Sequence, residues 1–181
     1  MRIISGSARG RKLKEPVGSN IRPTSDRVKE SVFTIIQFDI EGRRVLDLFA
    51  GSGQYGIEAL SRGAKSAVFV DFAGDSVKLI KENLKISGFS DAASVFGRDA
   101  LLYLENEEKY DLIFIDPPYD TKLAGKAVQK ITEFDKLNIN GIMMCEVKAD
   151  AQSPAVLPPY ILKKEYKYGN VKVIKYTREE L

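Results

Sequence analysis

The stretch Arg44-Val-Leu-Asp-Leu-Phe-Ala-Gly-Ser-Gly-Gln-Tyr-Gly56 joins an apolar run to a glycine-rich loop. Residues 44–49 have the composition of a buried strand, and the loop from Gly51 to Gly56 opens a helix that Gly63 should end. The same order recurs downstream, with further strands expected at 67–71, 93–96, 112–115 and 142–147. Strands that alternate with helices are typical of a parallel sheet covered on both faces. The sequence therefore predicts an α/β fold with a doubly wound, mostly parallel sheet.

Two hairpins are expected at the ends of this pattern. Residues 161–168 and 171–176 flank Gly169-Asn170, a two-residue turn of the kind that joins antiparallel strands. At the other end, residues 3–13 predict a short basic hairpin around a Gly/Ser/Arg-rich bend. A helix with one apolar face should follow, beginning at the capping oxygens of residues 24–26.

The composition indicates one substantial core. Of 181 residues, 44% are hydrophobic, which suits a single domain with a small appendage. We place the appendage at residues 1–40 and the main domain at residues 41–181. No run of about 18 apolar residues is present, so no membrane partner is expected. The first residues, Met1 to Gly6, lack the apolar segment of a signal peptide, so we expect a cytoplasmic protein.

The absence of histidine and the presence of one cysteine limit the possible chemistry. No Ser-His or Cys-His nucleophile and no imidazole base can form. The sequence likewise offers no histidine- or thiolate-ligated zinc site, and no metal is expected. Cys145 lies in an apolar run and is expected to be an inert core residue. Chemistry must therefore rest on carboxylates, tyrosine, lysine, backbone groups or a cofactor.

Positive charge is concentrated at the N-terminal end of the chain. Residues 1–30 hold eight Lys or Arg and three acidic residues, a net charge of +5, while the whole chain carries +3. A basic segment on a slightly acidic body is typical of a protein that binds a polyanion. The alternative is an ordinary solvated surface.

The glycine loop is compatible with two kinds of ligand. Gly51-Ser-Gly-Gln-Tyr-Gly56 satisfies the G-x-G-x-x-G pattern, and Asp71 follows about 20 residues on, as in dinucleotide sites. Asp47, however, lies inside the preceding strand, where its charge would repel a pyrophosphate. A nucleoside with a sulfonium and an amino-acid tail fits better, with Asp71 on the ribose hydroxyls, Asp99 on the adenine amine and Asp47 at the positive end. Asp71 and Asp99 could instead cap the helices that follow them.

A second motif, Asp116-Pro-Pro-Tyr119, follows the apolar run 111–115. The two prolines must end the strand and open a turn, and strand carboxyl ends are where open α/β sheets bind ligands. Asp116 and the Pro117 carbonyl can accept hydrogen bonds from an exocyclic amine, and Tyr119 can stack on its ring. The alternative is a β-turn with a packed tyrosine. The motif favours a flat substrate that carries an amine.

Together these motifs resemble the class I, S-adenosylmethionine-dependent methyltransferases that act on exocyclic amines. The chain looks most like the bacterial RsmD family, which methylates guanine N2 in small-subunit ribosomal RNA, and the resemblance covers essentially all of it. Two places depart from the family pattern, Gln54-Tyr55 in the glycine loop and Ser7-Ala8, which lacks the aromatic residue common there. The segments that carry the resemblance are Asp47–Gly53, Asp116–Tyr119, Met1–Gly6, Arg9–Leu13, Arg22–Thr24 with Asp26-Arg27, Glu58–Ala64 and the hairpin at Gly169.

The resemblance implies a seven-stranded class I methyltransferase sheet, S-adenosylmethionine as the cofactor and no metal. It also implies methyl transfer to 16S ribosomal RNA, within a small-subunit particle, by a monomer. The catalytic residues that it implies are Asp116, Pro117, Pro118 and Tyr119. The cofactor-binding residues are Asp47, Phe49, Ala50, Gly51, Gly53, Asp71, Phe72, Asp99 and Ala100. The RNA-binding residues are Arg2, Arg9, Arg11, Lys12, Arg22, Thr24 and Arg27.

Other functions stay open on the residues alone. One is an amine methyltransferase for adenine in DNA or for a glutamine side chain. Aspartate rather than asparagine at position 116 disfavours adenine, and the basic N-terminal segment disfavours a protein substrate. Another is a nicotinamide-dependent oxidoreductase, or an RNA-binding module without catalysis. The residues do not identify the modified nucleotide or distinguish naked RNA from an assembled particle.

Overall fold

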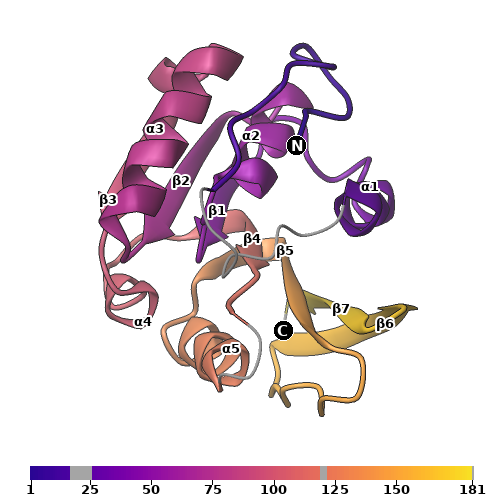
Figure 1. Cartoon of the computed structure of the whole chain (residues 1–181). Coiled ribbons are helices and arrows are strands. Elements are labelled where there is room, and N and C mark those ends of the chain that lie inside the picture. The colour runs from indigo at the N-terminus through magenta and orange to yellow at the C-terminus, as the bar shows by residue number, and fades with distance from the viewer. Residues whose placement is uncertain (17–25, 119–121, 181) are drawn as a thin grey trace.

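The computed structural model describes residues 1–16, 26–118 and 122–180, and a seven-stranded sheet forms its centre (Figure 1). The strand order is β3-β2-β1-β4-β5-β7-β6, with β1 to β5 parallel and β7 antiparallel to both β5 and β6. This confirms the predicted doubly wound, mostly parallel sheet with its C-terminal hairpin. The strands are β1 Arg44–Leu48, β2 Ser66–Asp71, β3 Ala93–Gly97, β4 Tyr110–Ile115, β5 Leu137–Lys148, β6 Tyr160–Tyr168 and β7 Val171–Arg178.

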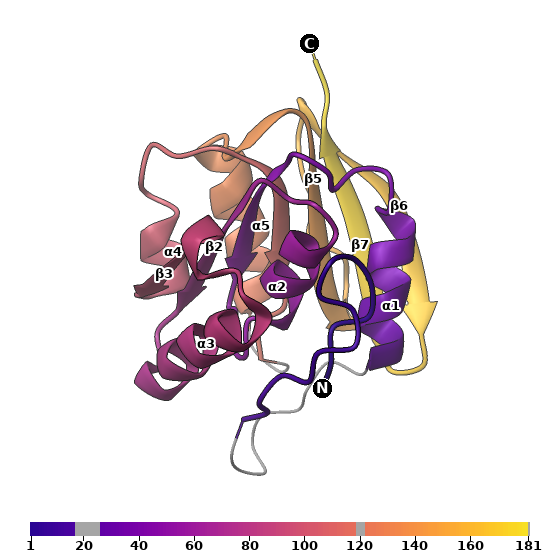
Figure 2. The ribbon, with the colours of Figure 1, turned by 90° about the horizontal axis from the view of Figure 1, so that it is seen from above.

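Helices cover both faces of the sheet (Figures 1 and 2). Side chains alternate along each strand, so neighbours such as Val45 and Leu46 enter different hydrophobic clusters. One cluster lies under α1, α2 and α3, and the other lies under α4 and α5. The helices are α1 Asp26–Ile35, α2 Gln54–Ser61, α3 Gly74–Ser87, α4 Ala100–Tyr103 and α5 Leu123–Glu133, with a 3₁₀ turn at Ser90–Ala92. Within the described ranges, no helix combines the length and apolar character needed to span a bilayer.

The N-terminal hairpin is present in a minimal form. It has a single antiparallel bridge, between Arg2 and Lys12, rather than two named strands. The N–H of Ile3 donates to the Arg11 carbonyl at 3.0 Å, and the N–H of Leu13 donates to the Met1 carbonyl at 3.1 Å. The oxygens expected to cap α1 at residues 24 and 25 lie outside the described residues.

A buried carboxylate fastens this hairpin to α2. Glu58 is 1% exposed and accepts hydrogen bonds from the N–H groups of Ile4 at 2.8 Å and Ser5 at 3.0 Å. It also pairs with Arg62 at 2.8 Å and lies 3.9 Å from the Lys29 ammonium. Burial lowers the pKa of Lys29, and the nearby Glu58 carboxylate opposes that shift. Ile3 also packs in a hydrophobic cluster of the main sheet. The N-terminal segment is therefore held both by these charged contacts and by apolar packing.

A glycine lets α2 approach the sheet closely. A Cβ built on Gly56 would lie 2.3 Å from the ring of Phe69 on β2, far inside normal contact distance. Gly125 in α5 is a matched helical glycine, because a Cβ there meets nothing within 4 Å. Gly56 is thus required by close packing, whereas Gly125 is not.

We expect Gly56→Ala to lower the free energy of unfolding by about 1–3 kcal/mol, since α2 or Phe69 must shift. Gly125→Ala should raise it by up to about 0.5–1 kcal/mol, because alanine is the better helix former. Urea denaturation of the two variants and the wild type measures both effects. A Gly56→Ala protein as stable as the wild type would contradict this account of the packing.

Candidate active site

The Asp116 motif lies where the strand order reverses. β1 continues on one side into β2 and on the other side pairs with β4, so the carboxyl ends of β1 and β4 adjoin. Leu48 of β1 is the register partner of Ile115, the last residue of β4. Asp116 and the two prolines come directly after that residue, as predicted. Open α/β sheets bind their ligands at such a reversal, outside the carboxyl ends of the strands.

Two carboxylates hold the glycine loop beside this point. Asp47 on β1 accepts a hydrogen bond from the Gly56 N–H at 2.9 Å, and Asp71 on β2 accepts one from the Gly51 N–H at 2.8 Å. The loop needs its glycines, because Gly51 and Gly53 have φ values of 56° and 79°, in the left-handed region. A Cβ on Gly51 would meet no atom within 4 Å, so the space in front of the loop is open to a ligand.

Asp47 places a carboxyl group inside the protein. It is 2% exposed, and burial raises its pKa well above the ordinary value. The hydrogen bond from Gly56 opposes this shift, while the nearby Asp116 and Asp71 carboxylates add to it. Within the described ranges, no three acidic, histidine or cysteine side chains are placed to hold a metal ion. The arrangement suits an organic cation, because positive charge would offset the repulsion between these carboxylates.

The other two predicted acid contacts have local roles as well. Asp71 accepts from the Ala73 N–H at 3.0 Å, in addition to the Gly51 N–H. Asp99 is the N-cap of α4, and its Oδ1 accepts from Leu101 at 2.9 Å and Leu102 at 3.0 Å. The helix-cap alternative is therefore present for Asp99. A carboxylate has lone pairs for further donors, so these bonds do not oppose a ligand role.

The remaining predicted cofactor residues surround the same edge. Phe49 is half-buried with a φ of 64°, an unusual value for a residue other than glycine. Phe72, directly after β2, has 78% of its surface exposed, so its ring is available to stack on a planar ligand. Ala50 and Ala100 are buried at the ends of β1 and of the β3–α4 connection.

The predicted RNA-binding residues divide into two groups. Arg2, Arg9, Lys12 and Arg27 are exposed. Arg11 is exposed as well, but its Nη1 donates to the carbonyls of residues 86 and 87, at 3.3 and 2.6 Å, and so caps the C-terminal end of α3. The predictions for Arg22, Thr24 and Tyr119 fall on residues outside the described ranges.

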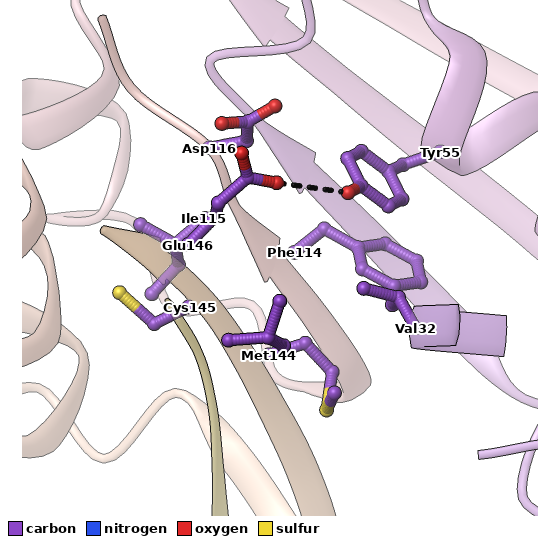
Figure 3. Close-up of a pocket in the computed structure, with 9 residues that line it drawn as sticks. Val32, Tyr55, Phe114, Ile115, Asp116, Met144, Cys145 and Glu146 are labelled. Carbon is purple, nitrogen blue, oxygen red and sulfur yellow. Dashed lines mark hydrogen bonds between the residues drawn. The ribbon is translucent and has the colours of Figure 1, made fainter. Parts of the chain in front are cut away.

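One pair of residues beside Asp116, Tyr55 and Glu146, was not predicted from the sequence. Glu146 on β5 is 5% exposed and accepts a hydrogen bond from the hydroxyl of Tyr55 at 3.2 Å (Figure 3). The ring of Tyr55 stacks on Phe114, with 5.0 Å between centroids. Both residues line a small cavity together with Asp116. A glutamate inside an otherwise apolar strand was the available signal, because a buried carboxylate must be paired. Cys145 is fully buried, and burial raises the pKa of its thiol, so the expected inert role fits.

The sequence model of one family, described as Conserved hypothetical protein 95, matches residues 1–177. YlbH of Bacillus subtilis is 37% identical over 98% of this chain and 99% of its own length. The Ribosomal RNA small subunit methyltransferase D of Haemophilus influenzae is 36% identical over 87% of this chain and 83% of its own. Among solved structures, yhhF of Escherichia coli superposes with a TM-score of 0.89 at 30% identity, covering 99% and 98% of the two chains. An RNA methyltransferase from Salinibacter ruber in complex with S-adenosyl-L-homocysteine shares the fold, with a TM-score of 0.67 at 17% identity over 88% and 95% of the chains.

Replacing Asp47 by asparagine should stabilise the ligand-free protein at neutral pH. The amide oxygen can still accept the Gly56 N–H, while the buried charge disappears. Because the folded pKa of Asp47 is raised, the wild type loses stability as pH rises from the ordinary value of 3.8 through the raised one. The advantage of Asp47→Asn should therefore be absent near pH 4 and grow with pH.

Urea denaturation at several pH values measures this difference, with Asp150→Asn as an exposed control. The control should change the free energy of unfolding by less than about 0.5 kcal/mol at any pH. If Asp47→Asn were the less stable protein at pH 8, the Asp47 charge would be compensated in the ligand-free state.

Proposed function

The chain belongs to the RsmD family, whose sequence model covers residues 1–177, and from this premise we propose that it transfers a methyl group from S-adenosylmethionine to the N2 amine of a guanine. The activity is that of a small-subunit ribosomal RNA methyltransferase, as in the relative from Haemophilus influenzae. The proposed acceptor is guanine 966 of 16S ribosomal RNA. The enzyme is proposed to act as a cytoplasmic monomer on the small-subunit particle.

The observation that carries this proposal is the position of Asp116-Pro-Pro beside the glycine loop. The loop presents open space at Gly51, and Asp47 places a buried carboxyl group next to it, whose ionisation a cationic ligand would favour. These features fit a nucleoside that carries a cationic sulfonium, and they do not fit a pyrophosphate. In this proposal Asp71 accepts the ribose hydroxyls, Asp99 accepts the adenine amine, and Phe72 stacks on the adenine ring. Phe49, Ala50, Gly53 and Ala100 would form the rest of the cofactor site.

Bound S-adenosylmethionine supplies the methyl group: a bond forms between the amine nitrogen and the methyl carbon, the carbon–sulfur bond breaks, and the product amine loses one proton. The protein has to align the amine and stabilise the charge that develops on its nitrogen. The Asp116 carboxylate and the Pro117 carbonyl are the proposed acceptors for the amine hydrogens. Because Pro117 and Pro118 carry no N–H, neither competes for these acceptors. Tyr119 is proposed to stack on the base after it leaves the RNA stack, which costs a few kcal/mol.

The exposed basic residues are proposed to hold the RNA backbone. Arg2, Arg9 and Lys12 lie on the N-terminal hairpin, and Arg27 lies in the first turn of α1. Each can contact a phosphate without disturbing the fold, because each is exposed. Arg22 and Thr24 complete the proposed surface. Arg11 is also proposed to contact RNA, in addition to capping α3.

The function is tested by mass spectrometry of 16S ribosomal RNA from a strain that lacks the gene. We expect N2-methylguanine to be absent at one position, and a plasmid copy of the wild-type gene should restore it. Asp116→Ala should fail to restore it although the protein accumulates. Unchanged 16S RNA in the deletion strain, or a lost methyl group on another atom, would overturn the proposal.

In single-turnover assays, Asp116→Ala should lower the rate of methyl transfer by about 10²–10³-fold, because the lost acceptor acts mainly as charge develops. Asp116→Asn keeps one acceptor oxygen and should lose less. Calorimetry should show that both variants bind S-adenosylmethionine within a few-fold of the wild type. A full rate for Asp116→Ala would make the turn after β4 a purely structural feature.

The RNA surface is tested through the dependence of binding on salt. Replacing Arg9, Lys12 and Arg27 by alanine should flatten the slope of log K against log salt by about 2 units, at roughly 0.7 per phosphate contact. The control variant replaces Arg43, Lys65 and Lys109 by alanine and so removes the same amount of positive charge. These residues directly precede β1, β2 and β4, at the opposite edge of the sheet. Equal slopes for the two triple variants would mean that only total charge matters.

A further inference from the structure

Asp116 has a second carboxylate beside it, on the next strand. Ile115 of β4 and Cys145 of β5 are register partners in a parallel pair, so the residues that follow, Asp116 and Glu146, occupy adjacent positions. Side chains alternate along both strands, and Phe114 and Met144, two residues earlier, enter the cluster under α1, α2 and α3. Asp116 and Glu146 therefore face that same side, as Figure 3 shows.

Tyr55 holds the Glu146 carboxylate in place. Its hydroxyl donates to Glu146 Oε2 at 3.2 Å, and its ring is fixed by stacking on Phe114. Burial raises the pKa of the Tyr55 phenol, and the charges of Glu146 and Asp116 add to that shift, so Tyr55 stays a donor. The two carboxylates thus sit close to one hydroxyl at the substrate side of the sheet.

A cavity of about 10 Å³ separates these groups, enough for one water-sized group. Most of its lining is apolar, with Val32, Met144 and Val173 among the residues, and Tyr55, Asp116 and Glu146 also line it. A whole base does not fit such a space, but one N–H group at the edge of a base does. The Asp116 and Glu146 carboxylates are among the lining residues, and when ionised they can pair with a donor but not with an acceptor.

We propose that Glu146 accepts a hydrogen bond from the N1–H of the target guanine while Asp116 accepts one from the neighbouring N2 amine, so that Glu146 determines the choice of base. This rests on the proposed function and adds the recognition of the purine ring to it. Guanine presents N1–H and the N2 amine side by side on its Watson–Crick edge. Adenine presents an unprotonated N1 there, whose lone pair would face the carboxylate.

The Tyr55 bond is compatible with this role. A carboxylate offers about four lone-pair positions, so Glu146 can accept from Tyr55 and from a base together. Tyr55 is a positioning residue, because it acts on the base through Glu146. A site built to accept a particular N–H discriminates strongly against an analogue that lacks it, since the acceptor then faces a lone pair of the base instead of a donor.

The experiment compares two bases at the acceptor position of 16S ribosomal RNA in reconstituted small-subunit particles. One carries guanine, and the other carries 2-aminopurine, which keeps the 2-amine but lacks N1–H and O6. For the wild type, kcat/KM should fall by about 10²-fold or more with 2-aminopurine. For Glu146→Gln, kcat/KM with guanine should fall while the ratio between the two bases drops at least tenfold, because an amide N–H₂ can donate to an unprotonated N1.

The ratio of kcat/KM on guanine to kcat/KM on 2-aminopurine is compared between the two proteins, so that differences between the bases unrelated to Glu146 cancel. The intrinsic reactivity of each amine and the loss of O6 affect both proteins alike and cancel. Glu133→Gln, an exposed glutamate at the end of α5, is the matched control and should keep the wild-type ratio. Thermal melting and S-adenosylmethionine binding report whether Glu146→Gln is folded, and the wild-type comparison is informative without any variant.

Each outcome decides one of the two proposals. Equal kcat/KM of the wild type on the two bases, or the same ratio in the wild type and Glu146→Gln, would overturn the assignment of Glu146. Both outcomes leave the proposed function intact, because guanine is still methylated. A wild type that does not methylate the 2-amine at the acceptor position of either particle would overturn the proposed function itself.

Discussion

The hydrogen bond from the Gly51 N–H to the Asp71 carboxylate ties the end of β2 to the loop that follows β1. With the matching bond from Gly56 to Asp47, it fixes both ends of the glycine loop and thereby the start of α2. The loop can then adopt left-handed backbone at Gly51 and Gly53, and it leaves open space instead of side chains in front of the sheet. The proposed cofactor site depends on that geometry, because the loop would separate the cofactor from the core.

The sheet could be predicted from the sequence because its central strands are buried on both faces and read as apolar runs. Two features escaped prediction for physical reasons. The helix α4 is a single turn nucleated by Asp99, too short to show a helical period. The contact between Tyr55 and Glu146 joins residues 91 positions apart, so only the strand order brings them together. Tyr55, which departs from the family pattern in the glycine loop, thus contacts Phe114 on β4 and Glu146 on β5. We therefore relate it to the proposed substrate site and not to the cofactor site.

The charge pattern singled out the basic N-terminal segment, but charge alone could not separate its freely exposed cations from those with structural roles. Arg11 caps α3, and Lys29 is fully buried beside Glu58, so these two cations stabilise the fold. Because Glu58 pairs with the backbone of residues 4 and 5, the hairpin is joined to the same helix that begins at the glycine loop. RNA held by the hairpin would therefore be placed relative to the cofactor by one rigid connection.

The proposed reaction resolves an electrostatic conflict within the site. The carboxyl ends of the strands gather Asp47, Asp71, Asp116 and Glu146, which would repel a polyanionic substrate. Exposed arginines and lysines on the hairpin and α1 can bind phosphates away from these acids, so that only an uncharged base has to enter. Bound at this site, the sulfonium of S-adenosylmethionine would offset the repulsion among these acids, whereas the thioether that remains after transfer would carry no such charge.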